Sequence, residues 1–136
     1  MWGMAPRAGA TIHTARFQTP RPPGTEFVGG TLDELFSATG LASSISQLAD
    51  LGVDAMGYCF TSSSVFGGTE FDREFTEVAG KLADCPVVTA GAALRAHLEG
   101  TATETMAILI PPWFTPSTIA ALTRYIVPDG GAARRK

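Results

Sequence analysis

Short apolar runs alternate with segments of helical periodicity along most of this chain, and that alternation constrains the fold more than any other feature. Segments with the composition of strands are residues 10–17 (ATIHTARF), 53–60 (VDAMGYCF), 86–89 (PVVT) and 105–110 (TMAILI). Runs that are almost continuously apolar are typical of strands covered on both faces in a parallel sheet. We therefore predict an α/β fold, a three-layer sandwich around a mostly parallel four-stranded sheet.

Helical periodicity fills the intervals between these runs. Thr31, followed by Glu34, has the pattern of a capping box, and we expect the helix that it opens to break at Gly40 and to stop at Gly52. Further helices are predicted over residues 69–83, 92–98 and 117–127. In the first of these, the face expected in the core comprises Phe71, Phe75, Val78, Ala79 and Leu82, and the face expected in solvent comprises Asp72, Arg73, Glu74, Glu77 and Lys81.

Length and composition fit one compact domain. The chain has 136 residues, of which 45% are hydrophobic and 17% are charged, a globular rather than a disordered composition. We predict an irregular N-terminus over residues 1–9, a single α/β domain over residues 10–127 and a disordered tail over residues 128–136.

Charge and cysteine content exclude several kinds of partner. The net charge is −3 and the only basic run is residues 134–136, so a nucleic-acid partner is not expected. No apolar run approaches the roughly 20 residues of a membrane span, and residues 1–7 lack the apolar stretch of a signal peptide, so we expect neither a membrane nor an export signal. Cys59 and Cys85 have neither CxxC spacing nor a histidine cluster nearby, so we expect no disulfide framework, no metal and a reducing, cytoplasmic compartment.

The candidate site lies where the apolar run 53–60 ends. Cys59 is followed closely by four hydroxyl residues, 61–64 (TSSS), and ligands of parallel sheets bind at the carboxyl ends of strands. Hydroxyl groups and backbone N–H groups suit a carboxylate or an enolate oxygen, and a thiol with a lowered pKa acts as a nucleophile or acid. An ordinary core cysteine followed by ordinary loop residues is the alternative.

Residues 54–68 (DAMGYCFTSSSVFGG) resemble the first-half active-site segment of maleate cis–trans isomerases and arylmalonate decarboxylases, a branch of the aspartate/glutamate racemase superfamily. That family has an apolar strand, a Cys or Gly, then Thr-Ser-x-Ser and a glycine-rich turn. The similarity continues through residues 85–98 (CPVVTAGAALRAHL), 106–116 (MAILIPPWFTP) and 11–17 (TIHTARF), and spans roughly residues 10 to 126. The resemblance implies the flavodoxin-like half of a two-domain racemase fold.

The same resemblance implies chemistry on a small dicarboxylic acid without a cofactor or a metal, through an enolate or a thiol adduct. Cys59 would be the catalytic residue. The substrate-binding residues carried over by position are Thr61 and Ser62, with Ser63 beside them, Thr89 at the rim, and Trp113 in the place of a pocket tyrosine.

The chain departs from the family pattern in ways that leave a second interpretation open. The family's nucleophile position falls on Phe60, and Trp113 offers an N–H group but no hydroxyl. The first strand of the family and its second half, with the second cysteine, are not in this sequence, so activity is expected to be impaired. The alternative is a non-catalytic small-anion-binding or remnant domain. Half of a two-domain fold would expose an apolar face, so we also expect a homo-oligomer.

Overall fold

A computed structural model of the chain describes residues 9–18, 31–38, 40–101, 105–110, 112 and 114–127. The disordered tail predicted over residues 128–136 lies outside these ranges. So do residues 1–8 of the predicted irregular N-terminus, and so does Trp113.

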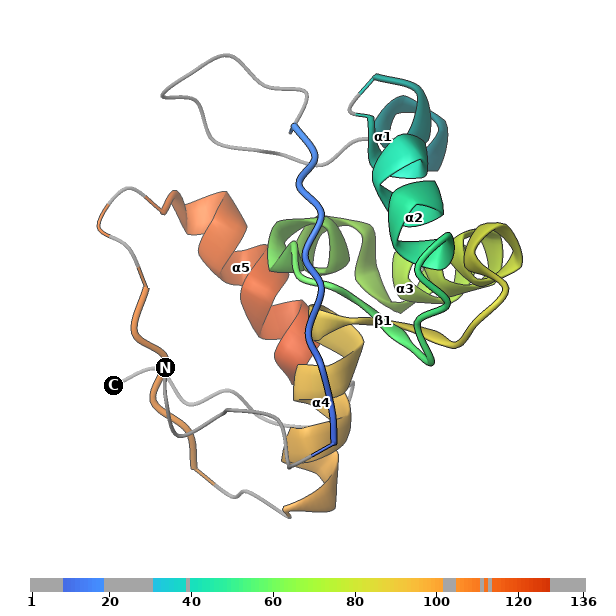
Figure 1. Cartoon of the computed structure of the whole chain (residues 1–136). Helices are drawn as coiled ribbons and strands as arrows, with labels where there is room; N and C mark the ends of the chain where they lie inside the picture. The colour runs from blue at the N-terminus through green and yellow to red at the C-terminus, as the bar shows by residue number, and fades with distance from the viewer. Residues whose placement is uncertain are drawn as a thin grey trace.

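Helices dominate the described residues (Figure 1). They are α1 (Leu32–Ala38), α2 (Leu41–Ala49), α3 (Thr61–Ala83), α4 (Ala90–Gly100) and α5 (Pro116–Ile126). The capping box is confirmed, because the Thr31 N–H donates to the Glu34 carboxylate over 2.9 Å and the Glu34 N–H donates to the Thr31 hydroxyl over 3.2 Å. Gly40, with φ 69°, is the N-cap of α2 and marks the break after α1, and Gly52, with φ 67°, follows the end of α2 at Ala49. Within the described ranges, none of the helices combines the length and apolar character needed to cross a membrane.

A small parallel sheet lies among the helices. Strand β1 (Met56–Tyr58) pairs with β2 (Val87–Thr89), in a register that sets Met56 opposite Val87 and Tyr58 opposite Thr89. The parallel sense agrees with the sequence analysis. The predicted four-stranded sheet, the three-layer sandwich and the flavodoxin-like half-fold are wrong, since the described part of the chain is mostly helical and its sheet has two strands.

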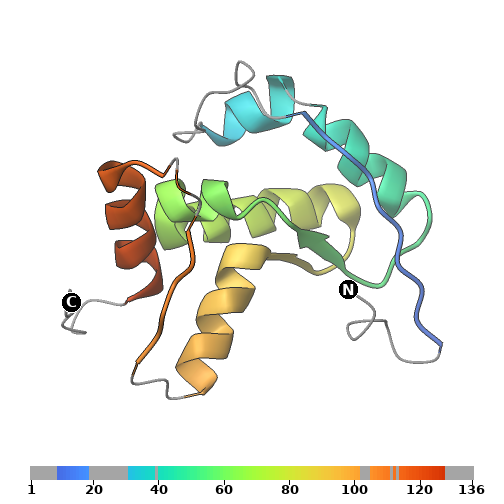
Figure 2. The same ribbon diagram turned by 90° about the vertical axis from the view of Figure 1, so that its left-hand side faces the viewer.

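The two other segments predicted as strands are extended but unpaired. Residues 9–18 pass β1 without joining it, as Figures 1 and 2 show, and residues 105–110 likewise form no ladder with a described strand. Residues 11–14 are all exposed, and the Leu109 side chain is 100% exposed. A strand is stabilised by a paired backbone together with cross-strand side-chain contacts, and β-propensity alone supplies neither.

The main hydrophobic core lies between α1, α2, β1 and the second half of α3. Phe75 is at its centre, with the Tyr58 ring stacked on it at 4.1 Å and the Phe71 ring at 5.7 Å, measured between ring centroids. The prediction that Phe71 and Phe75 are buried is confirmed, as it is for Ala79. The prediction is wrong for Val78 and Leu82, which are 45% and 42% exposed, because the covering elements enclose only part of the helix circumference.

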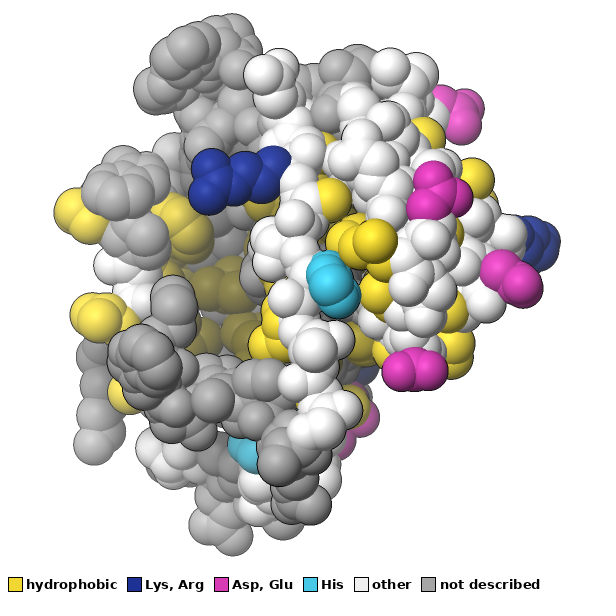
Figure 3. All heavy atoms as spheres, in the orientation of Figure 1, with side chains coloured by type: hydrophobic (Ala, Val, Ile, Leu, Met, Phe, Trp, Pro, Cys, Tyr) yellow, Lys and Arg dark blue, Asp and Glu magenta, His cyan; other side chains and the backbone are white. Residues whose placement is uncertain are grey.

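Helix α3 differs most from its predicted bounds, because it begins at Thr61 rather than at residue 69 and so includes the hydroxyl run 61–64. Gly68 interrupts the helix with φ 69° and ψ −166°, a backbone conformation that favours glycine. We call the residues before Gly68 the first half of α3 and those after it the second half. In the second half Asp72 is buried, against prediction. The other charged residues on the predicted polar face are exposed, and Figure 3 shows acidic side chains over the side that carries α1, α2 and the end of α3.

Candidate functional site

The parallel pairing of β1 and β2 brings their carboxyl ends to one edge of the sheet. Tyr58 lies opposite Thr89 there, α3 begins three residues after Tyr58, and α4 begins directly after Thr89. The predicted hydroxyl run therefore does lie at the carboxyl edge, where parallel sheets commonly bind ligands.

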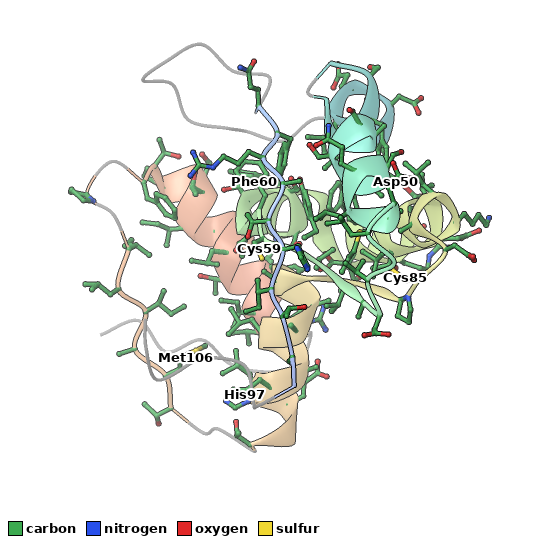
Figure 4. The ribbon with its side chains drawn as sticks, in the orientation of Figure 1. Asp50, Cys59, Phe60, Cys85, His97 and Met106 are labelled. Carbon is green, nitrogen blue, oxygen red and sulfur yellow. The ribbon has the colours of Figure 1, made fainter. Side chains whose placement is uncertain are left out.

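A cleft of about 920 Å³ lies beside β1, between the extended residues 9–17 and helix α2. Cys59 lines it and is exposed, and Figure 4 shows this residue close to the extended segment. Arg16 and His13 line it from the extended segment, and Asp54 lines it just before β1. We call this space the Cys59 cleft. The cleft therefore has an exposed thiol and an arginine among its lining residues, in a volume typical of small-molecule sites.

Cys59 and Phe60 differ in their surroundings, as neighbouring residues of an extended chain commonly do. The Phe60 ring is half-buried and meets the Phe17 and Tyr58 rings edge to face, with centroids 6.0 and 6.4 Å away. The Cys59 Sγ donates to the Gly57 carbonyl over 3.8 Å. Both residues line the Cys59 cleft, but the Phe60 ring packs against the aromatic core, whereas the Cys59 thiol is exposed.

The predicted substrate-binding residues do not converge on this cleft. Thr61 is exposed and Ser62 half-buried, and neither lines it. The buried Ser63 hydroxyl is hydrogen-bonded to the Tyr58 hydroxyl over 3.0 Å, and the Thr89 side chain is fully buried. Of the predicted site residues that are described, the structure places Cys59 alone in the cleft.

A second polar group at the same edge was not predicted. The buried Asp72 carboxylate accepts hydrogen bonds from Ser64 Oγ and Thr89 Oγ1 at Oδ1, each over 2.6 Å, and from the Tyr125 hydroxyl at Oδ2 over 2.5 Å. All four residues are buried, and we call them the Asp72 cluster. A buried carboxylate with three hydroxyl donors is well satisfied, which is what makes its burial tolerable.

The Asp72 cluster joins three parts of the fold. Ser64 and Asp72 lie on opposite sides of the Gly68 kink in α3, Thr89 ends β2 and caps α4 by accepting from the Ala92 N–H, and Tyr125 comes from α5. We predicted that Asp72 would be exposed, because the helical periodicity was counted from residue 69. The helix instead begins at Thr61 and is kinked at Gly68, and in this arrangement Ser64 donates a hydrogen bond to Asp72. The sequence analysis did not predict the kink.

The chemistry of this cluster is unfavourable for an anion. The Thr89 hydroxyl already donates to Asp72, so a carboxylate bound at Thr89 would compete with a buried acidic group. Burial, together with the hydrogen bond to Asp72, raises the pKa of Tyr125 far above its ordinary value, so this hydroxyl remains a donor. Burial also raises the pKa of Tyr58, against the opposing effect of its hydrogen bond with Ser63.

No family model, curated protein or solved structure matches the chain. Among the described residues, no group of three or more His, Cys, Asp and Glu side chains is placed to hold a metal ion. Function must therefore be inferred from the chemistry of the Cys59 cleft and the Asp72 cluster.

Proposed function

We propose that the chain acts on a small dicarboxylic acid in the Cys59 cleft, by cofactor-independent chemistry like that of maleate isomerases or arylmalonate decarboxylases. The observation that supports this most directly is that Cys59 is an exposed thiol lining a cleft of about 920 Å³. An exposed thiol in such a cleft is accessible to a substrate, which a core cysteine would not be.

Arg16 supplies a second feature in favour of an acidic substrate. Arg16 is one of the residues that line the same cleft, and guanidinium groups bind carboxylates through paired hydrogen bonds. Its backbone is held in place, because Ser44 Oγ donates to the Arg16 carbonyl over 2.8 Å. Arg16 and Cys59 line one cleft, so we propose that Arg16 binds a carboxylate of the substrate on which Cys59 acts.

In the isomerase version of the proposal, the Cys59 thiolate adds to one alkene carbon. As the sulfur–carbon bond forms, the π electron pair moves toward the adjacent carboxylate to give an enolate-like intermediate. The former double bond can then rotate. Expulsion of the thiolate reforms the double bond in the other geometry, so that neither electrons nor protons are consumed.

Replacing Cys59 by alanine is expected to abolish any turnover of maleate or phenylmalonate, with a loss of about a hundredfold or more, because the reacting sulfur is removed. Product formation by the purified chain, followed by chromatography, measures this. Cys85→Ala is the matched control. Cys85 is half-buried and precedes β2, so it lies at the opposite end of that strand, as Figure 4 shows, and its loss should leave the rate unchanged. Equal rates for wild type and Cys59→Ala would remove Cys59 from the mechanism.

Binding of a small anion without turnover is a second candidate. It is favoured by the environment of Cys59, whose one hydrogen bond among the described residues is with a backbone carbonyl rather than with a basic side chain. A thermal-shift titration with maleate and with malonate separates the two candidates. Stabilisation without product supports binding alone, and a ligand at 100 times its Kd would stabilise the fold by about 2.7 kcal/mol. If no dicarboxylate raises the melting temperature, both candidates are wrong.

We also propose that the chain forms a homo-oligomer through the extended residues 105–110. In this segment Met106 is 41%, Ile108 44% and Leu109 100% exposed, an apolar surface that favours association. Light scattering at micromolar concentration is expected to give at least twice the mass of the chain, and Leu109→Ser should lower it. Leu51→Ser, which changes an exposed leucine in another part of the fold, should not. A clean wild-type monomer would contradict this proposal.

The two thiols bear on where the protein works. Cys59 and Cys85 are both free, and Cys59 is exposed. Because an exposed thiol needs reducing conditions to stay reactive, we propose that the protein works in the cytoplasm.

A further inference from the structure

Helix α5 is attached to the rest of the fold through a small cluster of its own. The buried members of this satellite cluster are Val65, Ala121, Tyr125 and Ile126, and none of them belongs to the main core. Helix α5 packs chiefly against α3, and Figure 2 shows it beside the first half of α3, on the side away from α1 and α2. The apolar contribution to its docking is therefore smaller than that which holds the main core.

Tyr125 adds a polar link to this contact. Its hydroxyl donates to Asp72 Oδ2 over 2.5 Å, and the Arg95 guanidinium lies over its ring, 5.6 Å from the centroid. Gly91, at the start of α4, leaves room for that hydroxyl, because a Cβ atom there would be 2.5 Å from it and 2.4 Å from the Ser64 Cβ. The tyrosine is thus seated tightly, and its hydroxyl covers the carboxylate.

Beneath Tyr125 lie the other members of the Asp72 cluster. Asp72, Ser64 and Thr89 are all buried, and Thr89 is at the carboxyl end of β2. A helix docked through a small apolar cluster and a buried hydrogen bond from Tyr125 is expected to open at a lower free energy than the core to which it is docked.

We propose that α5 is a latched lid: the hydrogen bond from Tyr125 to Asp72 holds it closed over the Asp72 cluster, and α5 opens as a unit while α1, α2 and β1 stay folded. Opening exposes the Asp72 carboxylate with the Ser64 and Thr89 hydroxyls at the carboxyl edge of the sheet. The latch is independent of the Cys59 cleft, because no member of the Asp72 cluster lines that cleft.

Amide hydrogen exchange on the whole chain, read by mass spectrometry, tests the latch. Tyr125→Phe removes the hydroxyl and keeps the ring, so the satellite cluster and the Arg95 contact are retained. Since a hydrogen bond to a charged group is lost, exchange in α5 is expected to accelerate about tenfold or more, and exchange in α2 and the second half of α3 to stay unchanged.

Tyr58→Phe is the matched control, since Tyr58 is also buried and its hydroxyl is also hydrogen-bonded, but to Ser63, and the Tyr58 ring belongs to the main core. It should leave exchange in α5 at the wild-type rate. An unchanged α5 rate in Tyr125→Phe, or an equal acceleration in every helix, would overturn the latch. The wild type gives a second reading: α5 is expected to exchange at lower denaturant concentration than α2, and coincident exchange of the two helices would overturn the proposal without any variant.

Discussion

Phe75→Ala is expected to lower the free energy of unfolding by about 3–5 kcal/mol, the range for truncating a fully buried aromatic side chain. Phe75 is 1% exposed and touches three rings, those of Tyr58, Phe71 and Phe36. Truncation removes its apolar burial and leaves a cavity between β1, α1 and α3. Because domains of this size are stable by about 5–15 kcal/mol, the loss would consume a large part of the total. Urea unfolding followed by circular dichroism measures it.

Val78→Ala on the same helix is the control for this change. Val78 lies three residues after Phe75 and is 45% exposed, so its truncation should cost about 0.5 kcal/mol or less. A loss below 1 kcal/mol for Phe75→Ala would mean that the aromatic cluster is not the main core.

Asp72→Ala is expected to destabilise the fold by about 3 kcal/mol or more. The three hydroxyls of Ser64, Thr89 and Tyr125 would lose their common acceptor while remaining buried, and each unsatisfied buried polar group costs about 1–3 kcal/mol. The hydroxyls cannot simply turn to water, because all three side chains are buried. Urea unfolding followed by circular dichroism measures this loss as well. The dependence of the unfolding free energy on urea concentration should be unchanged, because it reports the surface exposed on unfolding.

Two further variants show which property of Asp72 matters. Asp72→Asn keeps one carbonyl oxygen and replaces the other with an N–H donor, so its loss should fall between those of wild type and Asp72→Ala. Glu74→Ala removes an exposed carboxylate two residues away, 3.8 Å from Arg73, and should change stability by about 0.5 kcal/mol or less. Equal stability of Asp72→Ala and wild type would show that the carboxylate does not organise this part of the fold.

The helices could be predicted because their signals are local. The capping box at Thr31, the break at Gly40 and the stop at Gly52 depend on a few neighbouring residues, and each is present in the structure. The sheet could not be predicted in the same way. Residues 10–17 and 105–110 have the composition of strands, but whether a strand forms depends on a partner distant in sequence, and composition carries no information about that partner.

The position of the candidate site at the end of β1 could be predicted for the same reason. A position directly after an apolar strand is a local property, and it led to Cys59, which does line a cleft. The Asp72 cluster depends on a contact between residues 72 and 125, which are distant in sequence, and on the Gly68 kink, which changes the faces that the two halves of α3 present. We expected Thr89 at the rim of a pocket, but its hydroxyl donates to the Asp72 carboxylate, which we had predicted to be exposed.

The kink at Gly68 divides α3 into two halves that pack in different hydrophobic clusters. Before it, Val65 and Phe66 belong to the satellite cluster of α5; after it, Phe71 and Phe75 belong to the main core. Any residue with a side chain at Gly68 would strain a backbone held at φ 69° and ψ −166°, and relief of that strain by straightening would rotate one half of the helix against the other. The backbone conformation at Gly68 thus sets the orientation of the main core relative to the satellite cluster of α5. A substitution at this position is expected to disturb the packing of both clusters.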